Sequence, residues 1–107
     1  MKLIVAIINS DDSQSVLSEI TKAGFYATKL STTGGFLRAG NLTLLMGVED
    51  NQVEELLEIL RANCKKRKEI TPLMPSINSG LFSAMPVEVT VGGATVFVID
   101  VEQFHKI

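Results

Sequence analysis

The order in which strand-like and helix-like patterns follow one another constrains the fold of this chain more than any other feature. Short apolar runs rich in β-branched or aromatic residues, typical of strands, cover residues 3–8, 25–31, 42–48, 87–91 and 94–101. Between them lie two segments whose apolar residues recur every three or four positions, as on one face of a helix. This order predicts an α+β domain in which two helices are interleaved with strands.

The residues at the ends of the two helical segments support this interpretation. The apolar faces are formed by Val16, Leu17, Ile20 and Ala23 in the first helix and by Val53, Leu56, Leu57 and Leu60 in the second. The first helix follows several possible N-caps in "NSDDS" and ends before Gly24, while Asp50 or Asn51 is expected to cap the second. With one strand set aside, the order is β-α-β-β-α-β. We therefore expect a ferredoxin-like sheet with two helices on one face, plus an extra hairpin strand.

Such a sheet leaves one face without helices. The first and last strands, 3–8 and 94–101, are nevertheless apolar on both faces. An uncovered apolar face needs a partner, so we expect an oligomer packed sheet to sheet. The alternative is that the long segment 69–85 folds back over the sheet.

A glycine-rich loop, "TTGGFLRAGN" at 32–41, joins two of the expected strands. Its spacing matches neither common phosphate-binding loop, and no helix follows it. Glycines suit a mobile loop, but they do not explain the presence of Phe36, Leu37 and Arg38 there. A phenylalanine ring can stack on a nucleobase, and Asn41 or Thr28 can hydrogen-bond to one, so we interpret the loop as a candidate ligand contact.

The second half of the chain contains a less regular segment. Residues 69–85 have no clear period and include prolines, yet they are apolar, so we expect them to order on a neighbouring subunit or a ligand. The basic run 65–68 is interpreted as a solvated end of the second helix. Gly92-Gly93 predicts a two-residue hairpin turn between the last two strands.

Composition excludes several classes of function. The 107 residues suffice for one domain, 1–107, and the net charge of −2 argues against binding a long nucleic acid. The apolar N-terminal run is too short to insert into a membrane. Cys64 has no partner for a disulfide, which favours a cytoplasmic location, and we expect it to pack in the core. His105 is expected at the surface. No catalytic set, metal site or cofactor motif is evident, so we predict a binding protein and not an enzyme.

Three stretches are similar to a known family. They are "ATKLSTTGGFLRAGN" at 27–41, "GV" at 47–48 and "PVEVTVGGATVFV" at 86–98, and the likeness extends from "MKLIVAI" to "FH". Together they resemble the PII-like cyclic di-AMP receptor proteins. The resemblance implies a bacterial signal-transduction receptor without enzymatic activity. It also implies a homotrimer of ferredoxin-like subunits, with a T-loop at about 33–41 and a B-loop at about 65–86. Cyclic di-AMP would bind between adjacent subunits and rearrange these loops, which would regulate an unknown downstream protein.

The resemblance also implies ligand contacts at positions that match the family's motifs. These are Thr28, Gly35, Phe36, Leu37, Asn41, Gly47 and Phe97, with Tyr26, Arg38 and Lys106 as further candidates. Glycine at 47 would let the ligand approach the backbone where a side chain would clash. Family members carry Asn and Arg in place of Gly24 and Tyr26, and Gln in place of Lys106. The alternative is therefore a PII-like trimer that has lost or changed its nucleotide and acts through protein interaction.

Overall fold

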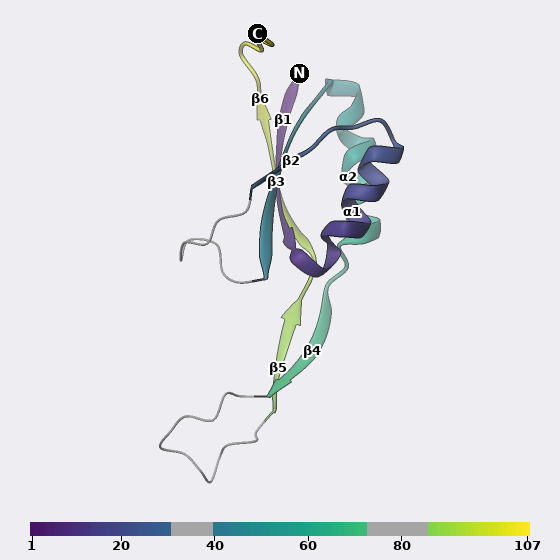
Figure 1. Ribbon diagram of the computed structural model, residues 1–107, viewed down its shortest axis with the longest axis vertical. Coiled ribbons are helices and arrows are strands. Elements are labelled where there is room, and N and C mark those ends of the chain that lie inside the picture. The colour runs from purple at the N-terminus through teal and green to yellow at the C-terminus, as the bar shows by residue number, and fades with distance from the viewer. Residues whose placement is uncertain (31–39, 73–85) are drawn as a thin grey trace.

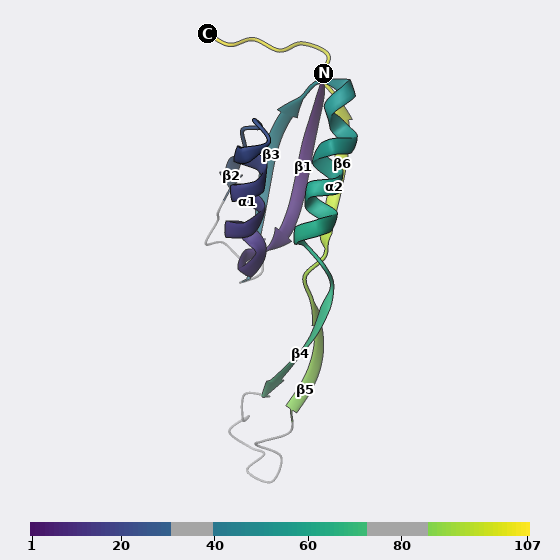
Figure 2. The same cartoon turned by 90° about the vertical axis from the view of Figure 1, so that its right-hand side faces the viewer.

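The computed structural model describes residues 1–30, 40–72 and 86–107, and of residues 69–72 and 86–89 it describes the backbone. The elements are β1 (Lys2–Asn9), α1 (Ser13–Lys22), β2 (Thr28–Leu30), β3 (Asn41–Val48), α2 (Val53–Asn63), β4 (Arg67–Pro72), β5 (Pro86–Val91) and β6 (Ala94–Asp100). Four strands form one antiparallel sheet in the order β2-β3-β1-β6. Both helices cover the same face of this sheet (Figures 1 and 2). The ferredoxin-like prediction is confirmed.

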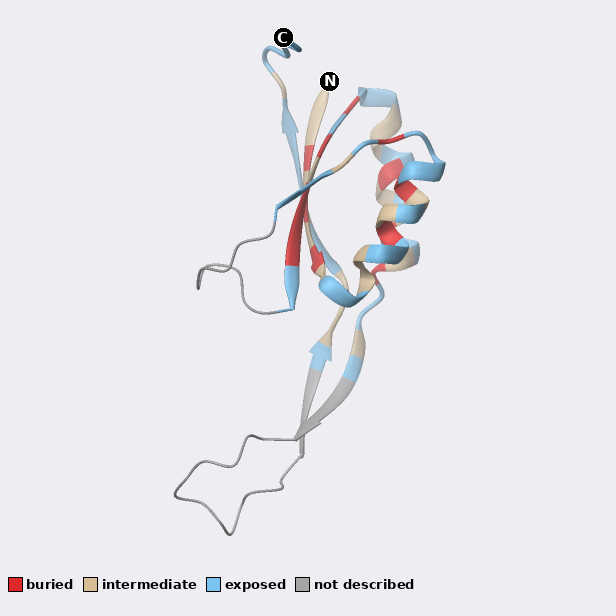
Figure 3. Cartoon of the chain, in the orientation of Figure 1, coloured by how far each residue is buried: buried red, intermediate tan, exposed pale blue. Residues whose placement is uncertain are grey.

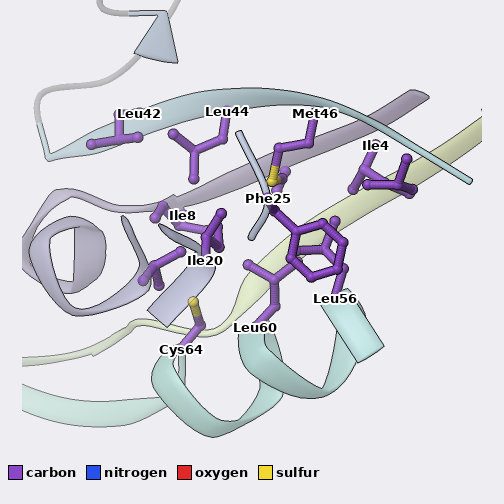
Figure 4. Packing of buried hydrophobic residues seen from close by; sticks show 13 residues of the cluster. Ile4, Ile8, Ile20, Phe25, Leu42, Leu44, Met46, Leu56, Leu60 and Cys64 are labelled. Atoms are coloured by element: carbon purple, nitrogen blue, oxygen red, sulfur yellow. The ribbon is translucent and has the colours of Figure 1, made fainter. Parts of the chain in front are cut away.

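The hydrophobic core lies between the helices and the sheet face that they cover. Alternate residues of the two central strands point into it, which is the period-two pattern of a half-buried sheet. Figures 3 and 4 show the buried residues gathered there. They are Ile4, Ala6, Ile8, Val16, Ile20, Phe25, Leu42, Leu44, Met46, Val48, Leu56, Leu60 and Cys64. Cys64 therefore packs in the core, as predicted.

A Schellman motif ends α1. Gly24 has φ +88°, its N–H donates to Thr21 O over 3.0 Å, and the Phe25 N–H donates to Ile20 O over 3.0 Å. The Phe25 side chain then joins Ile20 in the core, which is the hydrophobic contact typical of this motif. Because residues 25–27 leave the helix in this way, β2 begins at Thr28, and the predicted strand 25–31 was too long at its start.

The expected cap of the second helix was also wrong. The chain enters α2 through a 3₁₀ turn at Asp50–Gln52, and Glu49 is the residue that caps it. The Glu49 N–H donates to the Gln52 side chain over 2.9 Å, as in a capping box. Asp50 instead pairs with the N-terminal ammonium of Met1 at 3.0 Å, and this ammonium lowers the pKa of Asp50.

A two-stranded arm made of β4 and β5 projects from the sheet (Figure 1). The predicted hairpin turn at Gly92-Gly93 is therefore wrong, since β5 pairs with β4 while β6 pairs with β1. Both glycines have positive φ, which lets the chain bend from one sheet into the other. The basic run is not a helix end either, because α2 ends at Asn63 and β4 begins at Arg67.

The neck of this arm is fixed by side-chain and backbone contacts. Arg67 Nη1 donates to Asp12 Oδ1 over 3.1 Å and to the Lys65 carbonyl over 3.3 Å. A Cβ on Gly92 would collide with the same Lys65 carbonyl oxygen, so only glycine fits there. The expected B-loop at 65–86 thus begins with an ordered strand, while its residues 73–85 lie outside the described part of the chain.

The face of the sheet opposite the helices is called the open face here. Strand alternation places Thr28 and Leu30 of β2 on it, together with Thr43, Leu45 and Gly47 of β3, Leu3, Val5 and Ile7 of β1, and Thr95, Phe97 and Ile99 of β6. Leu3, Val5 and Ile7 are only half-buried, although Ile4, Ala6 and Ile8 beside them are buried. Within the described residues, the open face is thus a mostly apolar surface without a helix above it.

Candidate functional site

A cavity of about 470 Å³ lies at the β2 edge of the sheet, and we call it the β2-edge cavity. Its walls come from the N-terminus, the segment that leads from α1 into β2, the C-terminal half of β3, and the residues after β6. The lining residues are Met1, Tyr26, Ala27, Thr28, Leu45, Gly47, Phe104, His105 and Lys106. A volume of this size is within the range of small-molecule sites, which are mostly apolar with a few polar groups.

The chain after β6 is what closes this cavity. Figure 2 shows it leaving β6 at one edge of the sheet and running toward the β2 side. It thereby brings Phe104, His105 and Lys106 to the same cavity as Tyr26 and Thr28. His105 is exposed, as predicted, and its Nε2 lies 3.0 Å from Gln103 Oε1.

Four of the predicted site residues come together in the β2-edge cavity: Tyr26, Thr28, Gly47 and Lys106. Sequence reasoning missed Phe104 as a lining residue. Its signal was available, because an apolar ring lies two residues before the predicted contact Lys106 in a short polar tail. What the sequence could not show is that this tail crosses to the opposite edge of the sheet.

Gly47 borders the β2-edge cavity at a position where the fold leaves room for a side chain. It lies on the open face beside Leu45, and a Cβ built on it would meet no atom of the described chain within 4 Å. The fold itself therefore does not require glycine at this position. A side chain at 47 would instead extend into the β2-edge cavity and reduce its volume.

Phe97 lies far from this cavity. The register pairs Thr28 with Leu45, Leu45 with Val5, and Val5 with Phe97, which places all four in one row of the open face. Three strand spacings of roughly 4.8 Å put Thr28 and Phe97 about 14 Å apart, at opposite edges of the sheet. Phe97 is 51% exposed. One chain therefore does not bring these two predicted contacts together.

Asn41 is also separate from the β2-edge cavity. It begins β3, where it pairs with Asn9, and both line a smaller cavity of about 230 Å³ with Lys66 and the two neck glycines. The predicted contacts Gly35, Phe36, Leu37 and Arg38 lie outside the described residues. Of the expected T-loop, Gly40 is described, and its carbonyl accepts from the Ser10 N–H over 2.6 Å.

Several kinds of chemistry find no support in the described residues. Within 1–30, 40–72 and 86–107, no three His, Cys, Asp or Glu side chains are placed to hold a metal ion. Burial is the main cause that raises the pKa of the Cys64 thiol to about 11, which leaves it protonated and a poor nucleophile at neutral pH. No helix in the described part of the chain has the length and apolar character to cross a membrane.

A ferredoxin-like sheet with one open face, an edge cavity and a projecting arm is consistent with the PII-like fold. Comparison with known proteins agrees and gives the family. The chain belongs to the cyclic-di-AMP receptor family, whose model matches residues 1–107. Among solved structures, it is similar to a functionally unknown protein from Pediococcus pentosaceus ATCC 25745. That protein is 38% identical, with a TM-score of 0.72 over 99% of this chain and 96% of that one.

Proposed function

We propose that this protein is a receptor for the second messenger cyclic di-AMP, which it binds at the subunit interfaces of a homotrimer. The observation that carries the proposal is the β2-edge cavity, where Thr28, Gly47 and Lys106 meet in a chain whose whole length matches the receptor family. The Thr28 hydroxyl can hydrogen-bond to a base or phosphate. The Lys106 ammonium can neutralise a phosphate through a charge-assisted hydrogen bond.

The open face supports the subunit arrangement. Phe97 and Ile99 are about half exposed at one edge of the sheet, while the β2-edge cavity lies at the other edge. An apolar surface of this kind favours contact with a second copy of the chain. A neighbouring subunit that presents its Phe97 to the β2-edge cavity would join the two separated groups of predicted contacts. The ligand would then bridge two chains, and its binding would be coupled to their association.

The function is that of a signal receptor without catalysis, located in the cytoplasm. Binding would rearrange the T-loop and B-loop and thereby regulate a downstream protein. The alternative is a trimer with another nucleotide ligand or with none. That reading is favoured by Tyr26, which is 89% exposed at the cavity, at a position where the resemblance implies an arginine. A hydrogen bond from a charged arginine to phosphate is worth about 1.5–3 kcal/mol, so its loss could change both affinity and ligand choice.

Calorimetric titration of the purified protein with cyclic di-AMP tests the proposal, with cyclic di-GMP and ATP as controls. We expect saturable binding of one cyclic di-AMP per subunit and no comparable binding of the other two. Light scattering on the same sample should give the mass of a trimer. Preference for another nucleotide, or no heat at high micromolar cyclic di-AMP, would contradict the receptor assignment and favour the alternative.

A further inference from the structure

We propose that Tyr26 and Phe104 form an aromatic subsite in the β2-edge cavity and that one nucleobase of the ligand stacks against it. The inference rests on the proposed function, because it describes how that same cavity would recognise a nucleotide. It also goes beyond it, because it assigns a role to Phe104 and a specific role to the tyrosine at position 26.

The two rings come from distant parts of the chain and line the same cavity. Tyr26 follows the buried Phe25 in the segment between α1 and β2, and Phe104 lies in the segment after β6. Their exposed fractions are 89% and 63%, so neither ring is used by the hydrophobic core of this chain. Large exposed rings in one concave site are typical of surfaces that bind a flat apolar group.

The local backbone explains why Tyr26 is presented in this way. The Schellman motif at Gly24 sends Phe25 into the core. Tyr26 follows Phe25 directly and is exposed, whereas Thr28 begins β2 on the open face. The backbone of Tyr26 is therefore positioned at the cavity by a neighbouring residue that is itself anchored in the core.

The rest of the lining matches a nucleotide. Lys106 supplies a positive charge, and the described residues that line the cavity include no Asp or Glu. A base stacked on the aromatic subsite would leave its phosphate free to reach the Lys106 ammonium or the Thr28 hydroxyl. Stacking would thus provide affinity where an arginine at position 26 would instead bind phosphate.

The composition of the chain offers a direct spectroscopic test. Tyr26 is the only tyrosine, and the chain has no tryptophan. Intrinsic tyrosine emission of the whole protein therefore reports on this one ring. We expect titration with cyclic di-AMP to quench the emission with the same midpoint as the calorimetric curve. Free N-acetyl-tyrosinamide, titrated in parallel, corrects for absorption of light by the nucleotide.

Substitutions of the two rings test how much each one contributes to binding affinity. Phe104→Leu and Tyr26→Ala should each weaken binding by roughly 5- to 150-fold, the range reported for loss of a base–aromatic stack, whereas Tyr26→Phe should bind almost normally. Light scattering must show that each variant keeps the oligomeric state of the parent protein. If Phe104→Leu instead dissociates the oligomer, the ring serves subunit packing, and the subsite is wrong.

The outcomes separate the two proposals. Normal binding of cyclic di-AMP without quenching, and with unchanged affinity in Phe104→Leu, would overturn the aromatic subsite and leave the receptor function intact. Absence of cyclic di-AMP binding would overturn the receptor function. The emission is then measured with AMP and GMP: quenching by either supports the aromatic subsite, and no quenching by both overturns it.

Discussion

Thr28 and Phe97 occupy one cross-strand row of the open face at opposite edges of the sheet, with Leu45 and Val5 between them. In the proposed arrangement, the two residues that contact one ligand come from different chains. Subunit mixing tests this. On the proposed trimer, the Thr28→Val and Phe97→Ala proteins should each bind cyclic di-AMP weakly. After the two are unfolded together and refolded, roughly a quarter of the interfaces should regain both native residues and normal affinity.

The control for this experiment is each variant refolded alone, which should recover no sites. Both substitutions lie at exposed positions, so circular dichroism should show an unchanged fold. If the mixed sample shows no recovered sites, the two residues act within one chain or Phe97 does not touch the ligand.

Substitutions at Gly47 should affect ligand binding without lowering stability. Gly47→Ala should leave the free energy of unfolding unchanged or raise it by about 0.5–1 kcal/mol, because a Cβ there meets no atom and alanine loses less entropy than glycine in a strand. Gly47→Val should fold as well but weaken ligand binding by at least about tenfold, since its methyl groups extend into the cavity. Urea denaturation and calorimetry on the same samples check this. Binding unchanged by valine would mean that the ligand does not approach this strand.

Substitutions at Gly24 should instead lower the stability of the fold. Its φ of +88° is required by the Schellman motif, so Gly24→Ala should lower the free energy of unfolding by about 1–2 kcal/mol. Gly24→Asn should cost less, because asparagine tolerates this conformation. Urea denaturation gives the order Gly, Asn, Ala. An alanine variant as stable as the parent chain would mean that the end of α1 can close in another way.

Cys64 predicts a pH dependence of stability and reactivity. Burial, with a smaller contribution from nearby Asp12, raises the pKa of its thiol from 9.0 to about 11. The fold therefore favours the protonated thiol, and this contribution is complete below pH 9 and is lost as the pH rises toward 11. The free energy of unfolding should fall over that window, and less so in Cys64→Ala. At pH 7.5 the thiol should react with a disulfide reagent only when urea unfolds the protein. Rapid labelling of the folded protein would contradict its burial.

Loss of the Arg67 side chain should destabilise the pairing of β4 with β5. A two-stranded hairpin is only marginally stable by itself, so its contact with Asp12 at the neck should matter. In Arg67→Ala, backbone amides of β4 and β5 should exchange hydrogen about tenfold faster, while those of β1 should be unchanged. Arg61→Ala is a matched control, because Arg61 pairs with Glu54 and Glu58 at an exposed surface and its loss should leave the exchange of the arm unaltered. Equal exchange in all three proteins would mean that the pair does not hold the neck.

How far the sequence predicted this molecule depends on the range of the interactions involved. Local signals were reliable: the apolar period placed both helices, and Gly24 marked the end of the first one. The errors arose where distant segments decide the structure. Gly92-Gly93 has the residues of a hairpin turn, but the strand before it, β5, pairs with β4, and the strand after it, β6, pairs with β1. Likewise, the resemblance suggested Lys106, whereas Phe104 became visible as a cavity residue only when the C-terminal segment was seen to cross the sheet.

The arm has a further consequence for how such proteins can diversify. In the described part of the chain, its strands pair with each other and connect to the main sheet through the neck at Arg67 and Gly92. Residues added to or removed from the arm beyond that neck therefore leave the core and the β2-edge cavity unchanged. Selection can thus reshape the arm for new partners without altering the core or the β2-edge cavity. An engineer could use the same separation and exchange arms between relatives as cassettes.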